Sequence, residues 1–204
     1  MRSARLFKLK RFPFVTAIIV GINVLIFTIG HFVNDNDIKM KGYLSLEKFW
    51  FLEEYWRILT SMFLHADIFH IFNNMLVVTF LGSMLEEYMG HLWYGIGYIV
   101  SGIGGNALSL YLRYMHHEDF NSLGASGAAF GLDGLLLAII MMGGMKRNNF
   151  SIERVIFSIG LSVYAGYTSG NIDNGAHIGG LITGYAIGLL FCTIYKKKHG
   201  RYFD

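Results

Sequence analysis

The chain has 204 residues, of which 53% are apolar and only 15% are charged, whereas about 25% are charged in an average soluble domain. Its formal net charge is +3 and its one cysteine is Cys192, which excludes an internal disulfide and a cysteine-based metal centre. These values argue against a soluble enzyme. They favour a multi-pass membrane protein, since the 25 glycines allow helices to approach closely in a bilayer.

Six stretches are long and apolar enough to cross a bilayer, for which about 20 mostly apolar residues are needed. In chain order, we predict them at about residues 14–32, 68–85, 92–112, 123–142, 152–167 and 176–195. The fifth is the least distinct. The pattern predicts an all-α integral membrane protein with a single transmembrane domain over residues 1–204 and no internal repeat.

The segment between the first two spans, about residues 33–57, has the composition of an interfacial loop. Its aromatic residues are Phe49, Trp50, Phe51, Tyr55 and Trp56. Aromatic side chains of this kind concentrate at the level of the lipid headgroups. We therefore expect short helices that lie partly within the outer leaflet and contact membrane lipid.

An even number of spans places both chain ends on one side of the membrane. Twelve of the 17 Lys and Arg residues precede the first span, follow the last, or lie between the fourth span and the start of the fifth, up to Arg154. By the positive-inside rule, both termini are cytoplasmic. No small-residue cleavage site follows the first apolar stretch, so we interpret it as a retained helix. Charge gathered at the chain ends gives no reason to expect a nucleic-acid partner.

Polar residues recur in the second, fourth and sixth spans. The second contains His70 and Asn74, which are four residues apart and so share a helix face. The fourth begins at Gly124-Ala125-Ser126-Gly127, and the sixth at Asn174-Gly175-Ala176-His177. Even-numbered spans run from outside to inside, so all three sets lie near the outer ends of their helices. Polar groups inside a span mark a functional site by default.

These residue types suit nucleophilic acyl transfer. A serine hydroxyl is a weak nucleophile until an adjacent base such as histidine takes its proton. The oxyanion that forms needs hydrogen-bond donors already aimed at it, which His70, Asn74 and the Ser126 backbone can supply. Glycines beside Ser126, at positions 124 and 127, leave its hydroxyl accessible.

Taken together, these residues resemble the rhomboid family of intramembrane serine proteases, over about residues 55–189. The motifs that carry the resemblance are Trp56-Arg57, His65, His70-Ile71-Phe72-Asn73-Asn74, Gly82 with Glu86 and Gly90, Gly124-Ala125-Ser126-Gly127, and Ala176-His177 with Gly180 and Gly184.

The resemblance implies a six-helix bundle with Ser126 and His177 as a catalytic dyad, and it requires no catalytic acid, cofactor or metal. It also implies a water-filled cavity that opens to the extracytoplasmic side of the cell membrane. Its substrates would be single-pass transmembrane proteins, with a small residue before the cut.

Several motif residues are expected to support the site rather than react. A small-xxx-small face made by Gly180 and Gly184 should bring the sixth span against the fourth. Glu86 is expected to bind backbone or polar groups at the inner boundary. Arg57, beside Trp56, is expected to anchor the outer loop, and His65 to lie near the catalytic groups.

Other acids leave alternatives open. Asp173 precedes His177 by four residues and would contact it if the helix extended back that far. Asp133 lies about 10.5 Å along the helix from Ser126, too far to orient His177, and must face the bundle. The run His116-His117-Glu118-Asp119 would suit a metal or a solvated loop, but four adjacent residues cannot all face one ion.

Two other functions compete with proteolysis. A proton-coupled transporter would use intramembrane histidines and Asp133, but no inverted repeat is visible. A catalytically silent relative that binds membrane proteins should have lost Ser126 or His177, and both are present. The sequence therefore favours a protease.

Overall fold

The computed structural model describes residues 12–33, 35–143, 156, 159–160 and 172–199. Within these ranges the chain is helical, apart from turns and an isolated antiparallel bridge between Leu44 and Ser122. The longer helices are α1 (Phe14–Phe32), α4 (Ile68–Met89), α5 (His91–His116), α6 (Ser126–Met141) and α8 (Asn174–His199). The shorter ones are α2 (Asp35–Gly42), the π-helix η1 (Glu47–Phe51), α3 (Arg57–Thr60) and the 3₁₀ turn η2 (Ser61–Phe63).

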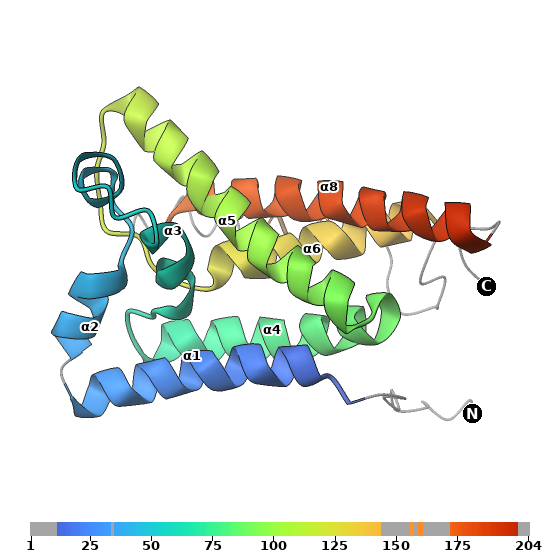
Figure 1. Cartoon of the computed structure of the whole chain (residues 1–204), viewed down its shortest axis with the longest axis horizontal. Helices are drawn as coiled ribbons and strands as arrows, with labels where there is room; N and C mark the ends of the chain where they lie inside the picture. The colour runs from blue at the N-terminus through green and yellow to red at the C-terminus, as the bar shows by residue number, and fades with distance from the viewer. Residues whose placement is uncertain (1–11, 34, 144–155, 157–158, 161–171, 200–204) are drawn as a thin grey trace.

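The long helices form one bundle (Figure 1). Helices α6 and α8 pack side by side, α4 packs on α1, and α5 crosses the bundle obliquely to contact α6 and α8. The short helices gather at one end of the bundle. Helix α1 begins and α8 ends at the opposite end, as expected if both chain ends lie on one side of a membrane.

The predicted spans correspond to long helices wherever the structure describes them. Three helices are long and apolar enough to cross a membrane, namely Phe14–Phe32, Ile68–Met89 and Asn174–Tyr195. Helix α5 is long enough, but Gly, Tyr and Asn residues dilute its apolar content, and α6 is shorter. The helical membrane architecture is therefore confirmed. Most of the predicted span 152–167 lies outside the described residues, so the count of six stays a prediction.

Helix α6 begins later than the apolar pattern predicts, at Ser126 instead of residue 123. The reason is Gly124, whose φ of +131° lies in a region that favours glycine. The chain turns there, and Ser126 becomes the first residue of the helix. The turn thus places the predicted nucleophile at a helix start rather than inside a span.

Glycines bring α6 and α8 into backbone contact. A Cβ atom built on Gly180 would overlap the carbonyl oxygen of Gly127, and one built on Gly184 would overlap that of Gly131. Further along, a Cβ on Gly188 would lie 2.7 Å from the Cβ of Ala138. The two helices therefore approach as closely as their main chains allow, which is the geometry expected for small residues one turn apart.

Arg57 is buried in the outer loop between α1 and α4. Its guanidinium donates to the carbonyl oxygens of Met40 (3.1 Å) and Tyr43 (2.8 Å) and pairs with Glu54. It thereby joins α2 to α3. Trp56 beside it is 55% exposed, so the pair consists of one internal anchor and one surface aromatic.

Glu86 is buried near the inner end of α4 and receives the start of α1. Its carboxylate accepts the backbone N–H of Val15 (2.8 Å), that of Thr16 (2.8 Å) and the Thr16 hydroxyl (2.7 Å). The first N–H groups of a helix have no partner within the helix, and Pro13 at the N-cap supplies no side-chain bond. Glu86 therefore caps α1 from a neighbouring helix.

Replacing Glu86 with glutamine should loosen the start of α1. We expect the free energy of unfolding to fall by about 2 kcal/mol, because charge-assisted bonds to a buried carboxylate are replaced by weaker ones and an amide N–H₂ faces other donors. Denaturation in mixed detergent micelles measures the loss. The exposed acid Glu47 provides the control Glu47→Gln, and equal stability of the two variants would contradict the capping role.

Candidate active site

Ser126 is delivered to the site by a loop that is pinned on both sides. The backbone of Ser122 exchanges two hydrogen bonds with Leu44 (2.8 and 2.9 Å), and Gly124 N–H donates to the carbonyl of Ser61 (2.9 Å). These bonds tie the residues before Ser126 to the outer loop and η2. Ser126 is half-buried at the start of α6.

His177 lies in the first turn of α8 and is 5% exposed. Its ring stacks on Phe130 with a centroid separation of 4.2 Å and an interplanar angle of 13°. Phe130 is four residues after Ser126 and so shares its face of α6. Among the described residues, His177 Nδ1 has no hydrogen-bond partner.

A second contact brings the starts of α6 and α8 to the same level. A Cβ atom on Gly127 would lie 3.2 Å from the carbonyl oxygen of Ala176 and 3.6 Å from its Cβ. The residue after Ser126 therefore packs against the residue before His177. Together with the Phe130 stack, this puts the serine and the imidazole on facing turns of two adjacent helices.

His70 approaches the serine from α4. A Cβ atom on Gly124 would lie 2.7 Å from His70 Nε2 and 3.8 Å from Ser126 Oγ. His70 Nε2 and Ser126 Oγ therefore both lie next to the α-carbon of Gly124, and a side chain at position 124 would fill the space beside them. His70 Nδ1 accepts the backbone N–H of Ala66 at 3.4 Å, which leaves the ring proton on Nε2 in the neutral form.

Asn74 follows His70 by one turn of α4 and is buried. Its Nδ2 donor has no partner among the residues that the structure describes. An unpaired buried donor costs about 1–3 kcal/mol, so such groups deserve a functional explanation. This amide suits a ligand oxygen that develops negative charge.

His65 and Asp67 support His70 from the loop before α4. The His65 ring lies edge-on to His70, 5.1 Å between centroids. Burial, reinforced by His70, lowers the pKa of His65 to about 3, so it is an uncharged neighbour. The Asp67 carboxylate accepts the N–H groups of Phe69 and His70, both at 2.9 Å, and caps α4.

A cleft of about 720 Å³ opens beside these residues, at the end of the bundle where α5 ends and α8 begins. It is bounded by His70, the end of α5, residues 120–123 and residues 172–175. Its lining is mixed, with serine, arginine, histidine and acidic side chains among apolar ones. His70 and Leu123 line it, whereas Ser126 and His177 do not, so the cleft can hold water and an extended peptide beside the loop before Ser126.

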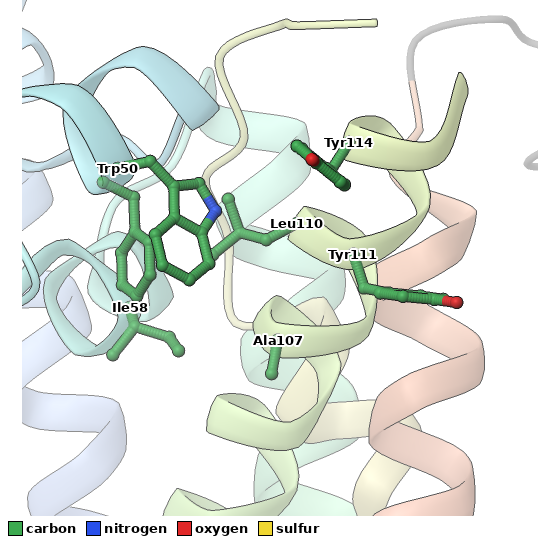
Figure 2. Close-up of a pocket in the computed structure, with 7 residues that line it drawn as sticks. Trp50, Ile58, Ala107, Leu110, Tyr111 and Tyr114 are labelled. Atoms are coloured by element: carbon green, nitrogen blue, oxygen red, sulfur yellow. The ribbon is translucent and has the colours of Figure 1, made fainter. Parts of the chain in front are cut away.

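A second pocket, of about 460 Å³, lies between η1, α3 and α5 (Figure 2). Aromatic and aliphatic side chains line it, including Trp50, Tyr111 and Tyr114. Among the described residues, the lining has no serine, histidine or acid. It is therefore not a candidate catalytic site.

Two of the acids considered above, Asp173 and Asp119, bind groups other than the His177 ring. The Asp173 carboxylate does not pair with the His177 ring but binds Arg113 at 2.8 Å. Asp119 accepts the N–H groups of Leu46 (2.8 Å) and Glu47 (3.1 Å), so it holds the outer loop. Within the described chain, no three histidine, cysteine or acidic side chains gather as metal ligands. Asp133 is half-buried on α6.

The sequence did not predict the polar residues that surround Asp173, among them Arg113. Arg113 lies just beyond the predicted span 92–112, yet it is part of α5 and is 3% exposed. A usable signal was present, because Ser109 and Arg113 are four residues apart in an apolar helix and so share one face. A polar face of this kind needs a partner inside the bundle.

Comparisons with known proteins agree with these motifs. The sequence model of the Rhomboid domain family matches residues 52–194. The chain is 32% identical to RHOMBOID-like protein 1 of Arabidopsis thaliana, over 95% of this chain and 56% of that protein. For Rhomboid protease GluP of Bacillus subtilis (strain 168), the identity is 34%, over 71% of this chain and 28% of that protein.

RHOMBOID-like protein 7 of Arabidopsis thaliana is 35% identical, over 77% of this chain and 49% of its own length. The chain thus spans about half the length of the plant relatives it matches.

Proposed function

Because this chain belongs to the rhomboid family, we propose that it is an intramembrane serine endopeptidase that cleaves transmembrane segments of single-pass membrane proteins. Ser126 is the nucleophile and His177 the general base. The observation that best supports this pair is the stack of the His177 ring on Phe130 at 4.2 Å, one helical turn beyond Ser126. The family's motifs in the right order support it independently.

In the first half of the reaction, a nitrogen of His177 takes the Ser126 hydroxyl proton as Oγ attacks the scissile carbonyl carbon. The carbonyl π bond opens and its oxygen becomes an oxyanion. His70 Nε2–H, the Asn74 amide and the Ser126 backbone N–H are the proposed donors to it. Support for this set comes from the unpaired Asn74 Nδ2 and from His70 Nε2, which faces the space next to Ser126 Oγ.

In the second half, the protonated His177 gives its proton to the leaving amine as the C–N bond breaks. The substrate acyl group then remains on Ser126 Oγ. Water from the cleft attacks this ester, His177 takes the water proton, and the C–Oγ bond breaks to return the proton to serine. The cycle uses no cofactor or metal.

The setting that we propose is the cell membrane, with both termini cytoplasmic and the site open to the extracytoplasmic side. The single domain would occupy residues 1–204. Two observations support this orientation. Ser126 and His177 lie at the starts of α6 and α8, at the end of the bundle away from the start of α1. The cleft lined by His70, the end of α5 and residues 172–175 opens at that same end.

The proposal is tested by cleavage of a model single-pass substrate with a small residue at the cut site. Purified wild type in detergent should cleave it, and Ser126→Ala should not, because only the Ser126 hydroxyl forms the acyl-enzyme. Ser83→Ala, on the inner half of α4, is the matched serine control. Cleavage that survives in Ser126→Ala would remove Ser126 as the nucleophile. A wild type that neither cleaves nor reacts with a fluorophosphonate would instead indicate a catalytically silent membrane-protein binder.

A further inference from the structure

A buried polar cluster next to the dyad takes no part in the reaction described above. It consists of the buried residues Ser109 and Arg113 on α5 and Ser122 in the loop before Ser126, together with the half-buried Asp173 just before α8. Three donors converge on one oxygen, Asp173 Oδ2. They are Ser109 Oγ at 2.6 Å, Ser122 Oγ at 2.7 Å and Arg113 Nη2 at 2.8 Å.

The other side of Asp173 faces the start of the histidine helix. Its Oδ1 accepts the N–H of Ala176 at 3.0 Å, and its backbone carbonyl accepts the N–H of His177 at 3.2 Å. These are the bonds of a helix cap, which satisfies the otherwise unpaired first N–H groups. Asp173 thus fixes the turn that carries the imidazole without contacting the imidazole.

Arg113 extends the cluster to the serine side. Its guanidinium donates to Ser109 Oγ (3.0 Å) and to the carbonyl oxygen of Phe120 (2.9 Å), and it lies 4.0 Å from the centroid of the Phe120 ring. Ser122, bound to the same carboxylate, is four residues before Ser126 and is paired with Leu44. The cluster therefore joins the serine loop to the histidine helix through side chains from three separate segments.

The charges in the cluster depend on one another. Burial raises the pKa of the Asp173 carboxyl, but Arg113 and the two serine hydroxyls outweigh it and hold that pKa below its usual range. Removal of one member of a buried ion pair leaves an uncompensated charge. Lysine would keep the charge of Arg113 but not the planar fork that serves several acceptors at once.

We propose that Arg113 and Asp173 are positioning residues that lock the loop before Ser126 to the first turn of α8, and so hold nucleophile and base in register. This inference rests on the proposed function. It gives the acid four residues before the histidine a role different from that of a triad acid, because its carboxylate bonds to Ser109, Arg113, Ser122 and the Ala176 N–H and not to the ring.

The first test is independent of catalysis. Amide hydrogen exchange of the full chain in detergent is compared between wild type, Asp173→Asn, Arg113→Lys and the exposed-acid control Glu47→Gln. In Asp173→Asn and Arg113→Lys, the amides of residues 118–126 and 174–178 should exchange about tenfold faster or more, because local opening costs less free energy when the cluster is broken. The start of α1 should be unchanged. Wild-type protection of both segments in Asp173→Asn would overturn the inference, whatever the activity.

The second test measures the chemical consequence. Asparagine has the size of Asp173. In place of the carboxylate oxygen Oδ2, which accepts three hydrogen bonds, it offers either an amide N–H₂ donor or a neutral, weaker oxygen acceptor. Fluorophosphonate labelling of Ser126 and kcat should each fall by about 100-fold, as for small misplacements of reacting groups, with KM little changed. Wild-type labelling and kcat in Asp173→Asn would overturn the positioning role.

A double variant separates positioning from stability. Arg113→Gln with Asp173→Asn removes both buried charges, so it avoids the uncompensated charge of either single change. We expect it to regain thermal stability while its labelling rate remains about 100-fold low. Recovery of wild-type labelling together with stability would overturn the positioning role. A wild type that is not labelled at all would contradict the proposed function, and the exchange data would then decide this inference alone.

Discussion

Replacement of His177 by alanine should lower both substrate cleavage and fluorophosphonate labelling of Ser126 by about 10⁴-fold or more, as in other serine hydrolases that lose the base. Without the imidazole, the serine hydroxyl stays protonated and is a weak nucleophile. The leaving amine also loses its proton donor. Single-turnover cleavage and labelling rates measure the two effects separately.

The control for this variant has to account for the packing of the ring on Phe130. Thermal unfolding in detergent should show that His177→Ala remains folded, and His31→Ala, at the exposed end of α1, should retain full activity. Phe130→Leu keeps an apolar side chain under the imidazole but removes the ring stack, so we expect a loss of about tenfold from poorer orientation. Wild-type labelling of His177→Ala would remove this residue from the mechanism.

Replacement of Gly180 by alanine should disrupt the bundle more than any other single methyl addition that we describe. The new Cβ would overlap the Gly127 carbonyl oxygen, which belongs to the backbone and cannot rotate away. We expect a loss of about 3 kcal/mol or more in the free energy of unfolding, at the upper end of the range for overpacked sites. Labelling of Ser126 should fall as well, because α6 and α8 would separate at the level of the dyad.

Gly21→Ala is the matched control for Gly180→Ala. Gly21 lies in the interior of α1, and a Cβ built there meets nothing within 4 Å. Gly21→Ala should therefore stabilise the protein by about 0.5–1 kcal/mol through helix propensity. Chemical denaturation in detergent measures both variants. Equal stability of Gly180→Ala and Gly21→Ala would contradict the backbone contact between α6 and α8.

The fold was predictable from the sequence where the apolar pattern is uninterrupted. Helix α1 covers Phe14–Phe32, as predicted, because its apolar residues end sharply against polar ones. The prediction for α6 was three residues too long at its start, because composition does not report that Gly124 adopts a φ of +131°. The predicted fifth span falls mostly outside the described residues and stays a prediction.

The sequence predicts the reacting groups of the candidate site, and their roles stay a prediction, whereas the contacts that support them could not be predicted. Ser126 and His177 stand in short motifs whose chemistry can be read directly from the residue types. The role of Asp173 depends on Arg113, 60 residues earlier, and on the oblique path of α5 that brings the two together. No local pattern encodes that crossing, so the acid four residues before the histidine was considered only as a partner of the ring.

The glycine contacts between α6 and α8 also bear on how the protein responds to its bilayer. Helices separated by side chains can slide or rotate as rotamers change, whereas two main chains in direct contact have no such freedom. A thinner or thicker bilayer alters the tilt of membrane helices. Here it would tilt α6 and α8 as one rigid unit, so the spacing between serine and histidine should be insensitive to lipid chain length.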